Sequence, residues 1–345
     1  MPLESIEEEN IIVLPEPNQS TKISISLPKI FYIKNIKTID DAYKKILELQ
    51  PLLINLSNLA FTENNKKAWD IIQKLMYYWN YRDILRIERI QDNTPLVEYA
   101  LRKVILDTQQ QTLPNYKLEC ENSFTPERAV QELSEKALSH RINQHPLLER
   151  MTQHGLEMQH IKLFLENYYV NNRMFHLFIV ALSLCSPLER RTELANNFYD
   201  EMGSGDSRMA HPELFLKNFN NLNRPEVITP LPESLYLVNT KTHAAFLSGD
   251  YHYGMGGFGY IELTMPNQMK KILNGLMKSG LPKADLEFWE IHITIDIEHG
   301  KRWFSEMLQL IETPEQAKKC LAGGISLLDA RATMYDGILQ SYDSM

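Results

Sequence analysis

Two histidines and an aspartate follow one another at helical spacing near the C-terminal end of the chain. His292, Asp296 and His299 are separated by steps of four and three residues. At about 100° per residue, Asp296 lies about 40° to one side of His292 and His299 about 20° to the other. Alternate residues between them are isoleucines, so this polar stripe runs along a largely apolar helix. Buried polar groups need partners, and a metal ion can satisfy imidazole and carboxylate groups together.

The spacing of the histidines favours two metal ions over one. His292 and His299 are two turns apart, roughly 10 Å along a helix axis. Asp296 lies between them and can reach toward either side. Two ions about 3.5–4 Å apart, one beside each histidine, would satisfy all three side chains. Oxygen and imidazole ligands suit iron or manganese better than a zinc–thiolate site. On this segment alone, three separately hydrogen-bonded polar residues in a bundle are an open alternative.

Two further segments carry acids and a histidine in settings that suit metal ligands. Glu201 ends an apolar-faced helix, and two glycines after it allow the chain to turn. His211 follows and precedes a proline, which favours an extended backbone there. Glu262 lies between two aliphatic residues, where a carboxylate needs a partner or a ligand role. Taken singly, each segment also fits a solvated helix end or edge.

These segments must be positioned by helices, because apolar residues recur at three- and four-residue steps over most of the chain. Such patterns cover residues 42–61, 68–79, 95–106, 157–185, 188–203, 241–280 (with a break near 254–259), 283–311 and 314–342. Pro51 should kink or split the first of them. One stretch, 22–33, looks β-like, and the sequence predicts an all-α fold. We expect a flexible arm over 1–25, an N-terminal helical region over 26–120 and the main domain over 121–345.

Composition narrows the class of protein. The chain has 345 residues, 43% apolar and 23% charged, which is typical of a globular protein. The net charge is −8 without a block of Lys or Arg, which argues against a nucleic-acid partner. An acidic N-terminus and the lack of a membrane-length apolar run predict a cytoplasmic protein without a membrane partner. Three cysteines without close spacing indicate neither a disulfide framework nor a zinc ribbon.

Four segments, in order, resemble the haem-oxygenase-like di-iron oxidases, also described as iron-containing redox enzymes. The chain is similar in particular to the chlamydial protein associating with death domains, and more broadly it resembles the TenA and PqqC group. The matching segments are 164–178 with its tyrosine pair, 196–215, 259–266 and 288–303. The resemblance covers about 126–311 and does not extend to 1–120. It implies a haem-oxygenase-like (TenA/PqqC-like) helical bundle with an extra N-terminal helical region.

In that family the matching positions bind two irons that activate dioxygen, with manganese as a possible substitute. The resemblance therefore implies a ligand set of Glu201, His211, Glu262, His292, Asp296 and His299. The gap between Glu201 and His211 is longer than in some relatives, so that His211 depends on loop geometry. Candidates for orienting the histidines, by proximity in sequence, are Glu290, Glu298, Tyr168, Tyr169 and Arg302.

Two other acids deserve mention beside that set. Glu166 lies on the core helix before it and is a further candidate carboxylate. Glu157 and His160 form one copy of the Glu-x-x-His pattern that ferritin-type sites use in two copies. A single copy near a helix start is expected to be solvated surface.

The resemblance implies oxidation of a small substrate, an amino acid or other carboxylic acid, with dioxygen as co-substrate. Desaturation, N-oxygenation and oxidative C–C cleavage are all compatible with it, as are an external electron donor and a homodimer. We expect an arginine near the pocket to bind the carboxylate, without assigning its position. Two alternatives stay open. One is a TenA-like hydrolase, for which Cys185 is the nearest nucleophile, and the other is an interaction protein that keeps the fold without catalysis.

Overall fold

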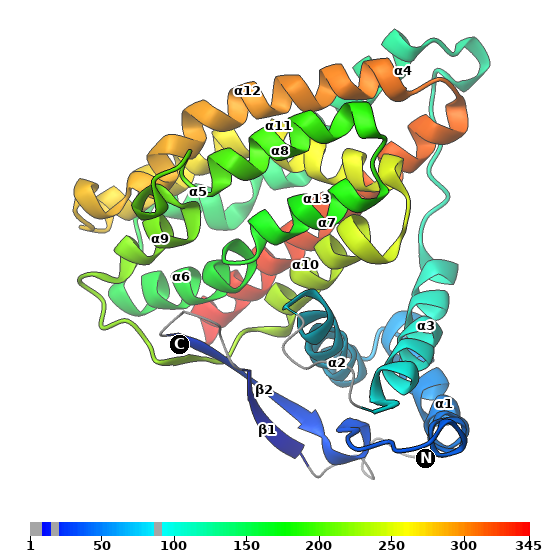
Figure 1. Cartoon of the computed structure of the whole chain (residues 1–345). Coiled ribbons are helices and arrows are strands. Elements are labelled where there is room, and N and C mark those ends of the chain that lie inside the picture. Colours follow the sequence, from blue (N-terminus) through cyan, green and yellow to red (C-terminus); the bar gives the residue numbers. More distant parts are fainter. Residues whose placement is uncertain (1–8, 15–20, 86–91) are drawn as a thin grey trace. The chain divides into compact units, whose positions relative to one another are not determined.

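Helices make up most of the chain, as the sequence predicts. The computed structural model describes residues 9–14, 21–85 and 92–345, whose elements are labelled in Figure 1. The chain divides into two compact units, a first unit of Met1–Asn115 with Pro225–Leu235 and a second unit of Tyr116–Arg224 with Tyr236–Met345. The mainly helical fold class is confirmed, and a small sheet in the first unit is the exception.

The first unit contains a three-stranded sheet. β1 (Glu9–Leu14) pairs antiparallel with β2 (Lys22–Pro28), and the start of β2 pairs in parallel with β3 (Val227–Ile228). β1 has four consecutive β-branched or aliphatic residues, Ile11–Leu14, whose exposure alternates, whereas most residues of β2 are buried. The partner β3 lies about 200 residues further along the chain, so no local pattern could indicate this pairing.

The sheet changes the interpretation of the N-terminal arm. Of the residues 1–25 expected to form a flexible arm, 9–14 and 22–25 are strand. Residues 1–8 and 15–20 lie outside the described residues. The β-like pattern over 22–33 becomes β2 followed by a short 3-10 helix, Lys29–Phe31.

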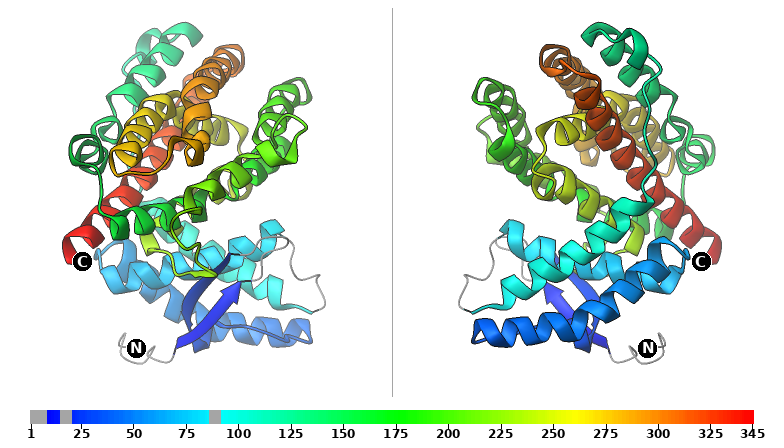
Figure 2. Two further views of the ribbon diagram at one scale, coloured as in Figure 1. Left: turned by 90° about the vertical axis from the view of Figure 1, so that its left-hand side faces the viewer. Right: turned by 90° about the vertical axis from the view of Figure 1, so that its right-hand side faces the viewer.

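Three helices complete the described part of the first unit: α1 (Ile39–Phe61), α2 (Lys66–Leu85) and α3 (Thr94–Thr112). Both views of Figure 2 show them beside one another. The Thr38 side chain caps α1 by accepting a hydrogen bond of 3.1 Å from a backbone N–H in its first turn. Of the kink or split expected at Pro51, the split does not occur, because α1 continues as one helix through the proline. Buried leucines on both sides of Pro51 anchor it, which compensates for the missing backbone donor.

The second unit is helical throughout its described residues. Its helices are α4 (Pro126–Ser139), α5 (Pro146–His154), α6 (Met158–Asn172), α7 (Phe175–Cys185), α8 (Arg191–Glu201), α9 (His211–Leu216), α11 (Tyr251–Lys278), α12 (Glu287–Leu310) and α13 (Pro314–Ser344). α10 (Pro232–Thr242) begins in the first unit, ends in the second and continues into a π-helix, His243–Leu247. Short 3-10 helices are Glu121–Ser123, Arg141–Gln144, Leu188–Arg190, Ser207–Met209, Lys217–Phe219 and Lys283–Asp285.

Two helix boundaries differ from the prediction. The pattern over 157–185 predicts one helix, but α6 ends at Asn172 and α7 begins at Phe175. Two consecutive asparagines close α6, and asparagine side chains compete for backbone hydrogen bonds. The expected break at the glycines of 254–259 is absent. The break lies earlier, where the Asp250 side chain caps α11 by accepting from the backbone of its first turn at 3.0 and 3.3 Å.

Glycines in α11 and α13 serve close packing rather than a break. The two helices lie side by side in Figures 1 and 2, and α12 packs against another part of α11. A Cβ on Gly256 would overlap the backbone of Cys320, and a Cβ on Gly323 would overlap the backbone of Tyr253. The glycines therefore let the backbones of α11 and α13 touch, which fixes the position of both helices in the core.

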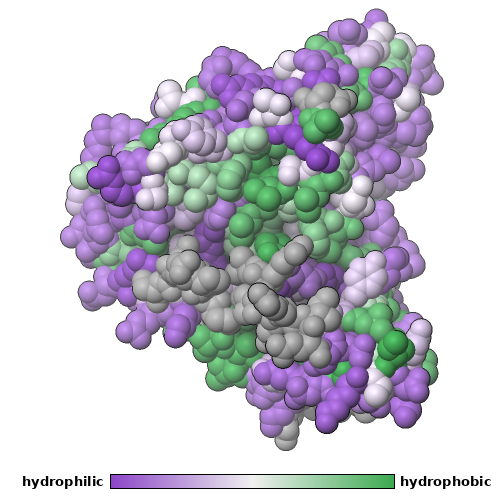
Figure 3. Space-filling view, viewed as in Figure 1, coloured by the Kyte–Doolittle hydropathy of each residue, from purple (hydrophilic) through white to green (hydrophobic). Residues whose placement is uncertain are grey.

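The surface of the second unit is mixed. Polar side chains cover much of the face shown in Figure 3, and an apolar area lies in its middle, around α7 and α8. Val180 and Leu184 of α7, followed by Leu188, are exposed apolar residues of this region. None of the helices among the described residues is long and apolar enough to cross a membrane.

Candidate metal centre

Four helices of the second unit bring the six predicted ligands together. Glu201 is the last residue of α8 and His211 the first of α9, while Glu262 lies within α11 and the remaining three on α12. The nine-residue connection between Glu201 and His211 reverses the chain direction, with positive φ at Gly203 and Gly205. All six side chains are buried. They form two groups of three whose ligand atoms lie within 4.8 Å of one another.

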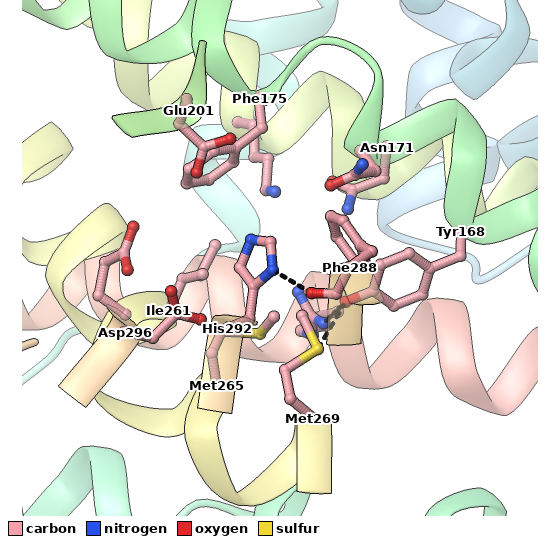
Figure 4. A pocket seen from close by; sticks show the side chains of 14 residues that line it. Tyr168, Asn171, Phe175, Glu201, Ile261, Met265, Met269, Phe288, His292 and Asp296 are labelled. Carbon is pink, nitrogen blue, oxygen red and sulfur yellow. Dashed lines mark hydrogen bonds between the residues drawn. The ribbon is translucent and has the colours of Figure 1, made fainter. Parts of the chain in front are cut away.

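The first group consists of Glu201, His211 and His292. His292 donates from Nδ1 to the backbone carbonyl of Phe288 at 2.6 Å, which leaves Nε2 with its lone pair. Figure 4 shows this bond on one side of the ring and Glu201 beyond the other side. The rings of His211 and His292 are 4.4 Å apart, and Nδ1 of His211 lies 2.9 Å from Oε2 of Glu201. These three side chains therefore converge on one point.

The second group consists of Glu262, Asp296 and His299. Nδ1 of His299 lies 3.5 Å from Oε2 of Glu262. Its other nitrogen, Nε2, donates to the carboxylate of Asp200 at 3.2 Å. A carboxylate in this position fixes both the orientation and the tautomer of an imidazole ligand. Asp200 thus does for His299 what the Phe288 carbonyl does for His292.

The donor set fits two divalent metal ions. Nδ1 of His211 and Nδ1 of His299 are buried without a hydrogen-bond partner in the protein, although each faces a carboxylate oxygen. A metal cation between the nitrogen and the oxygen would bind the lone pairs of both atoms. Without a cation or a proton between them, the two lone pairs would face each other unsatisfied. Three imidazoles with three carboxylates suit iron or manganese by ligand type.

The electrostatics of the first group favour the protonation states in which its side chains can bind a metal ion. Burial alone would raise the pKa of Glu201, but the charge of His211 and His292 outweighs it and lowers that pKa to about 2. Burial, reinforced by the neighbouring charge of His211, lowers the pKa of His292 to about 3. At neutral pH the carboxylate is therefore ionised and the His292 ring neutral, the forms in which both groups bind metal.

In the second group, the electrostatics favour protonated forms. Burial and the charges of Glu262 and Glu201 hold the pKa of Asp296 well above its usual range. Burial would lower the pKa of His299, but Glu262 and Asp200 outweigh it and raise that pKa to about 9. Clustered buried carboxylates thus attract positive charge, which a metal ion would supply while displacing protons.

A small cavity of about 30 Å³ is lined by residues of both groups. That volume holds little more than a water molecule, so a substrate would enter only if the lining side chains moved. Phe175, Met265 and Met269 contribute apolar surface to the cavity wall, and Figure 4 shows Phe175 on one side of His292 and the two methionines on the other. Charged groups also line it, among them Lys241 and Arg331. Within the described part of the chain, neither has a carboxylate within ion-pair distance.

Other predicted residues lie apart from the two groups. Glu166 is half-buried, 3.9 Å from Lys162, and belongs to neither group. The expectation that His160 is solvated is wrong, because its ring packs 4.4 Å from that of Tyr342 in the interior. His160 is therefore part of the packed interior and belongs to neither group of candidate ligands.

The candidates for orienting residues divide in the same way. Tyr168 lines the cavity and accepts a hydrogen bond from Arg331. Glu290, Glu298 and Arg302 instead form ion pairs outside the site, with Lys283, Lys301 and Glu193 respectively. Tyr169 is buried and lines no part of the cavity.

Three residues of the site were not predicted from the sequence. Asp200 immediately precedes Glu201, and its adjacency to a ligand was the available signal. Lys241 is a lone cation in a helix that packs into the interior, and Arg331 lies on the last helix among small and apolar residues. A charged residue on a buried helix face is such a signal, although only the folded chain shows which cavity it reaches.

The fold and the site together define a helical protein with a candidate two-metal centre in the bundle core. Residues 162–332 match the family described as "Iron-containing redox enzyme", and this part of the chain belongs to that family. The match includes all six residues of the two groups. The suspected family is thereby confirmed.

The chain is also similar to a curated protein and to solved structures. A "4-aminobenzoate synthase" of Nitrosomonas europaea is 24% identical over 220 residues, which cover 59% of this chain and 88% of that protein. A solved domain of unknown function with a haem-oxygenase-like fold from Shewanella denitrificans superposes with a TM-score of 0.51 at 14% identity, covering 63% of this chain and 91% of that one. A protein of unknown function from Nostoc punctiforme, described as CADD-like, gives 0.51 at 18% identity, covering 63% and 97%. The two structures support the haem-oxygenase-like fold.

Proposed function

We propose that this chain is a non-haem di-iron oxidase that uses dioxygen to oxidise a small carboxylic acid. The observation that carries the proposal is the pair of buried groups, Glu201 with His211 and His292, and Glu262 with Asp296 and His299. Each group offers imidazole and carboxylate ligands within one coordination sphere. Each also contains a buried imidazole nitrogen that lacks a hydrogen-bond partner. Manganese is a possible substitute, because it accepts the same ligands.

The protein's own part is to hold the ligands and to keep the site dry. Two bound irons would supply electrons and oxidising power for dioxygen chemistry. The Phe288 carbonyl and the Asp200 carboxylate hold the rings of His292 and His299 in the orientation that presents one nitrogen to the metal. The cavity beside His292 offers an apolar wall to the carbon skeleton of a substrate. Its burial limits access of water to reactive species.

Desaturation, N-oxygenation and oxidative C–C cleavage are the reactions that we propose for this site. In a desaturation, dioxygen takes up four electrons and four protons to form two waters. The substrate supplies two of each, and an external donor supplies the rest. A relative described as a 4-aminobenzoate synthase supports a carboxylate-bearing molecule in this site. The homodimer and the external donor are further predictions.

The hydrolase alternative lacks support from the thiols. Cys185 donates its thiol to the carbonyl of Leu182 at 3.3 Å and does not line the cavity. Burial raises the pKa of the Cys185 thiol, which disfavours the nucleophilic thiolate. Cys320 is buried in the packing of α13, and burial raises its pKa further. A TenA-like thiol mechanism would need a cysteine in the cavity.

Anaerobic loading with ferrous ion, followed by metal analysis and oxygen consumption, tests the proposal. Wild-type protein should bind two irons per chain and consume dioxygen after loading. His292→Ala and His299→Ala should each lose one iron and the oxygen consumption. His160→Ala is the matched control, because His160 is a buried histidine outside both groups. A folded wild-type protein that binds no iron would favour the interaction role, and loss of iron in His160→Ala would contradict the ligand assignment.

A further inference from the structure

The cavity beside the two groups is lined by a buried lysine whose amino group has no ion-pair partner among the described residues. Lys241 is 1% exposed and lines the cavity. Its ammonium lies over the ring of Phe175, 4.7 Å from the centroid. Among the described residues, no hydrogen bond or ion pair reaches it. The cation–π contact with Phe175 offsets only a small part of the cost of burying an ammonium group. A negatively charged ligand beside Lys241 would offset more of that cost.

A second cation on the same cavity adds to this imbalance. Arg331 is also buried and donates to Gln268 at 3.0 Å and to the hydroxyl of Tyr335 at 3.1 Å. Arg331 also donates to the hydroxyl of Tyr168, and all three partners are neutral, so none of them balances the charge of the guanidinium. The carboxylates of Glu201 and Glu262 influence Lys241 electrostatically from beyond ion-pair distance. As metal ligands, these carboxylates would have their charge taken up by the metal ions.

We propose that Lys241 binds the carboxylate of the substrate, and that the substrate is an anion with a short apolar body. The proposal rests on the proposed function for the reaction, but the binding itself does not need metal. Arg331 adds positive charge to the same cavity, while Phe175 and Met265 offer contacts to the carbon chain. Lys241 therefore determines which molecules enter in the reactive orientation.

The backbone around Lys241 suits this role. Lys241 lies in the last turn of α10, and the helix continues at once into the π-helix His243–Leu247. Single π-helical turns are frequent at functional sites, because the wider turn redirects the side chains next to it. Burial and the charge of Arg331 lower the pKa of Lys241 well below its usual range. An arriving carboxylate would reverse this, so binding should be accompanied by proton uptake.

Isothermal titration with hexanoate and with hexanamide, its neutral counterpart, tests the role of Lys241. Wild-type protein should bind hexanoate more tightly than hexanamide. Lys241→Met keeps the length of the side chain and should weaken hexanoate binding about 10- to 100-fold, since a charged hydrogen bond is lost. Hexanamide binding should stay unchanged. Lys241→Arg should retain the preference for hexanoate, and Lys301→Met, at an exposed position, is the matched surface control.

Titrations in two buffers of different ionisation enthalpy give a second readout. Wild-type protein should take up protons on binding hexanoate, and Lys241→Met should take up fewer. Equal hexanoate affinity in wild-type protein and Lys241→Met would overturn the proposal. So would a wild-type protein that does not distinguish hexanoate from hexanamide at millimolar concentration, or a Lys241→Arg variant that loses the preference. Running the titrations with chelated and with iron-loaded protein separates this result from the iron proposal, whose failure appears in the iron content alone.

Discussion

The contact between α11 and α13 predicts a large difference between two neighbouring glycines. In Gly256→Ala, the new Cβ would lie 2.5 Å from the carbonyl carbon of Cys320 and closer still to its Cα and carbonyl oxygen. Carbon atoms in contact sit about 3.5–4.0 Å apart. The helices would have to separate by about 1 Å, because the obstructing atoms are backbone and cannot rotate away. Overpacking costs about 1–3 kcal/mol, and a contact with backbone belongs at the upper end.

Replacing glycine by alanine also stabilises a helix interior by about 1 kcal/mol. The net destabilisation of Gly256→Ala is therefore about 2 kcal/mol, or about 4–8 °C in Tm. Gly257→Ala is the matched control on the same helix. Its Cβ would meet the end of the Leu327 side chain, which can change rotamer, and lies 3.3 Å from the carbonyl oxygen of Gly323. It should change the free energy of unfolding by less than about 1 kcal/mol.

Thermal unfolding followed by circular dichroism measures both variants. Because α11 also carries Glu262, Gly256→Ala should weaken iron binding in addition to lowering Tm. A Tm of Gly256→Ala equal to or above that of the wild-type protein would refute the packing argument. Equal losses in Gly256→Ala and Gly257→Ala would show that the rotatable side chain and the fixed backbone obstruct alike, contrary to the reasoning.

Three further outcomes follow from single contacts. Asp200→Asn should weaken binding of one of two irons about 10- to 100-fold, measured by competition with a chelator, because His299 loses its orienting carboxylate; unchanged affinity would contradict this. Burial lowers the pKa of His243, so stability is full above about pH 6.5 and falls on acidification by up to about 1.4 kcal/mol per pH unit. His243→Gln should reduce that slope in urea unfolding, and an unchanged slope would exclude this histidine as its source. Thr313→Ala should lower stability by about 1 kcal/mol by removing the cap of α13, and a neutral effect would show that the capping contact is dispensable.

The helices and the polar stripe on α12 could be predicted from the sequence, because both depend on local periodicity. His292, Asp296 and His299 share a face as a consequence of helical geometry alone, and the structure places them as three buried side chains on one helix. Their separation by two turns predicts two ions, and in the structure they divide between two groups. The role of these residues as ligands is a proposal that rests on that arrangement.

Long-range features could not be read in the same way. The pairing of β2 with β3 joins residues about 200 positions apart, and the glycines of α11 look like helix breakers until α13 is seen against them. Lys241 and Arg331 are ordinary charged residues in the sequence. Their lack of a carboxylate partner is a property of the folded cavity, where burial removes water as an alternative partner.

The central claim is that two irons occupy the two groups of the second unit. Anomalous diffraction at the iron absorption edge, from crystals of anaerobically loaded protein, tests it most directly. Two peaks are expected, one among Glu201, His211 and His292 and the other among Glu262, Asp296 and His299. A single peak shared by His292 and His299, or iron bound elsewhere on the chain with both groups empty, would contradict the account.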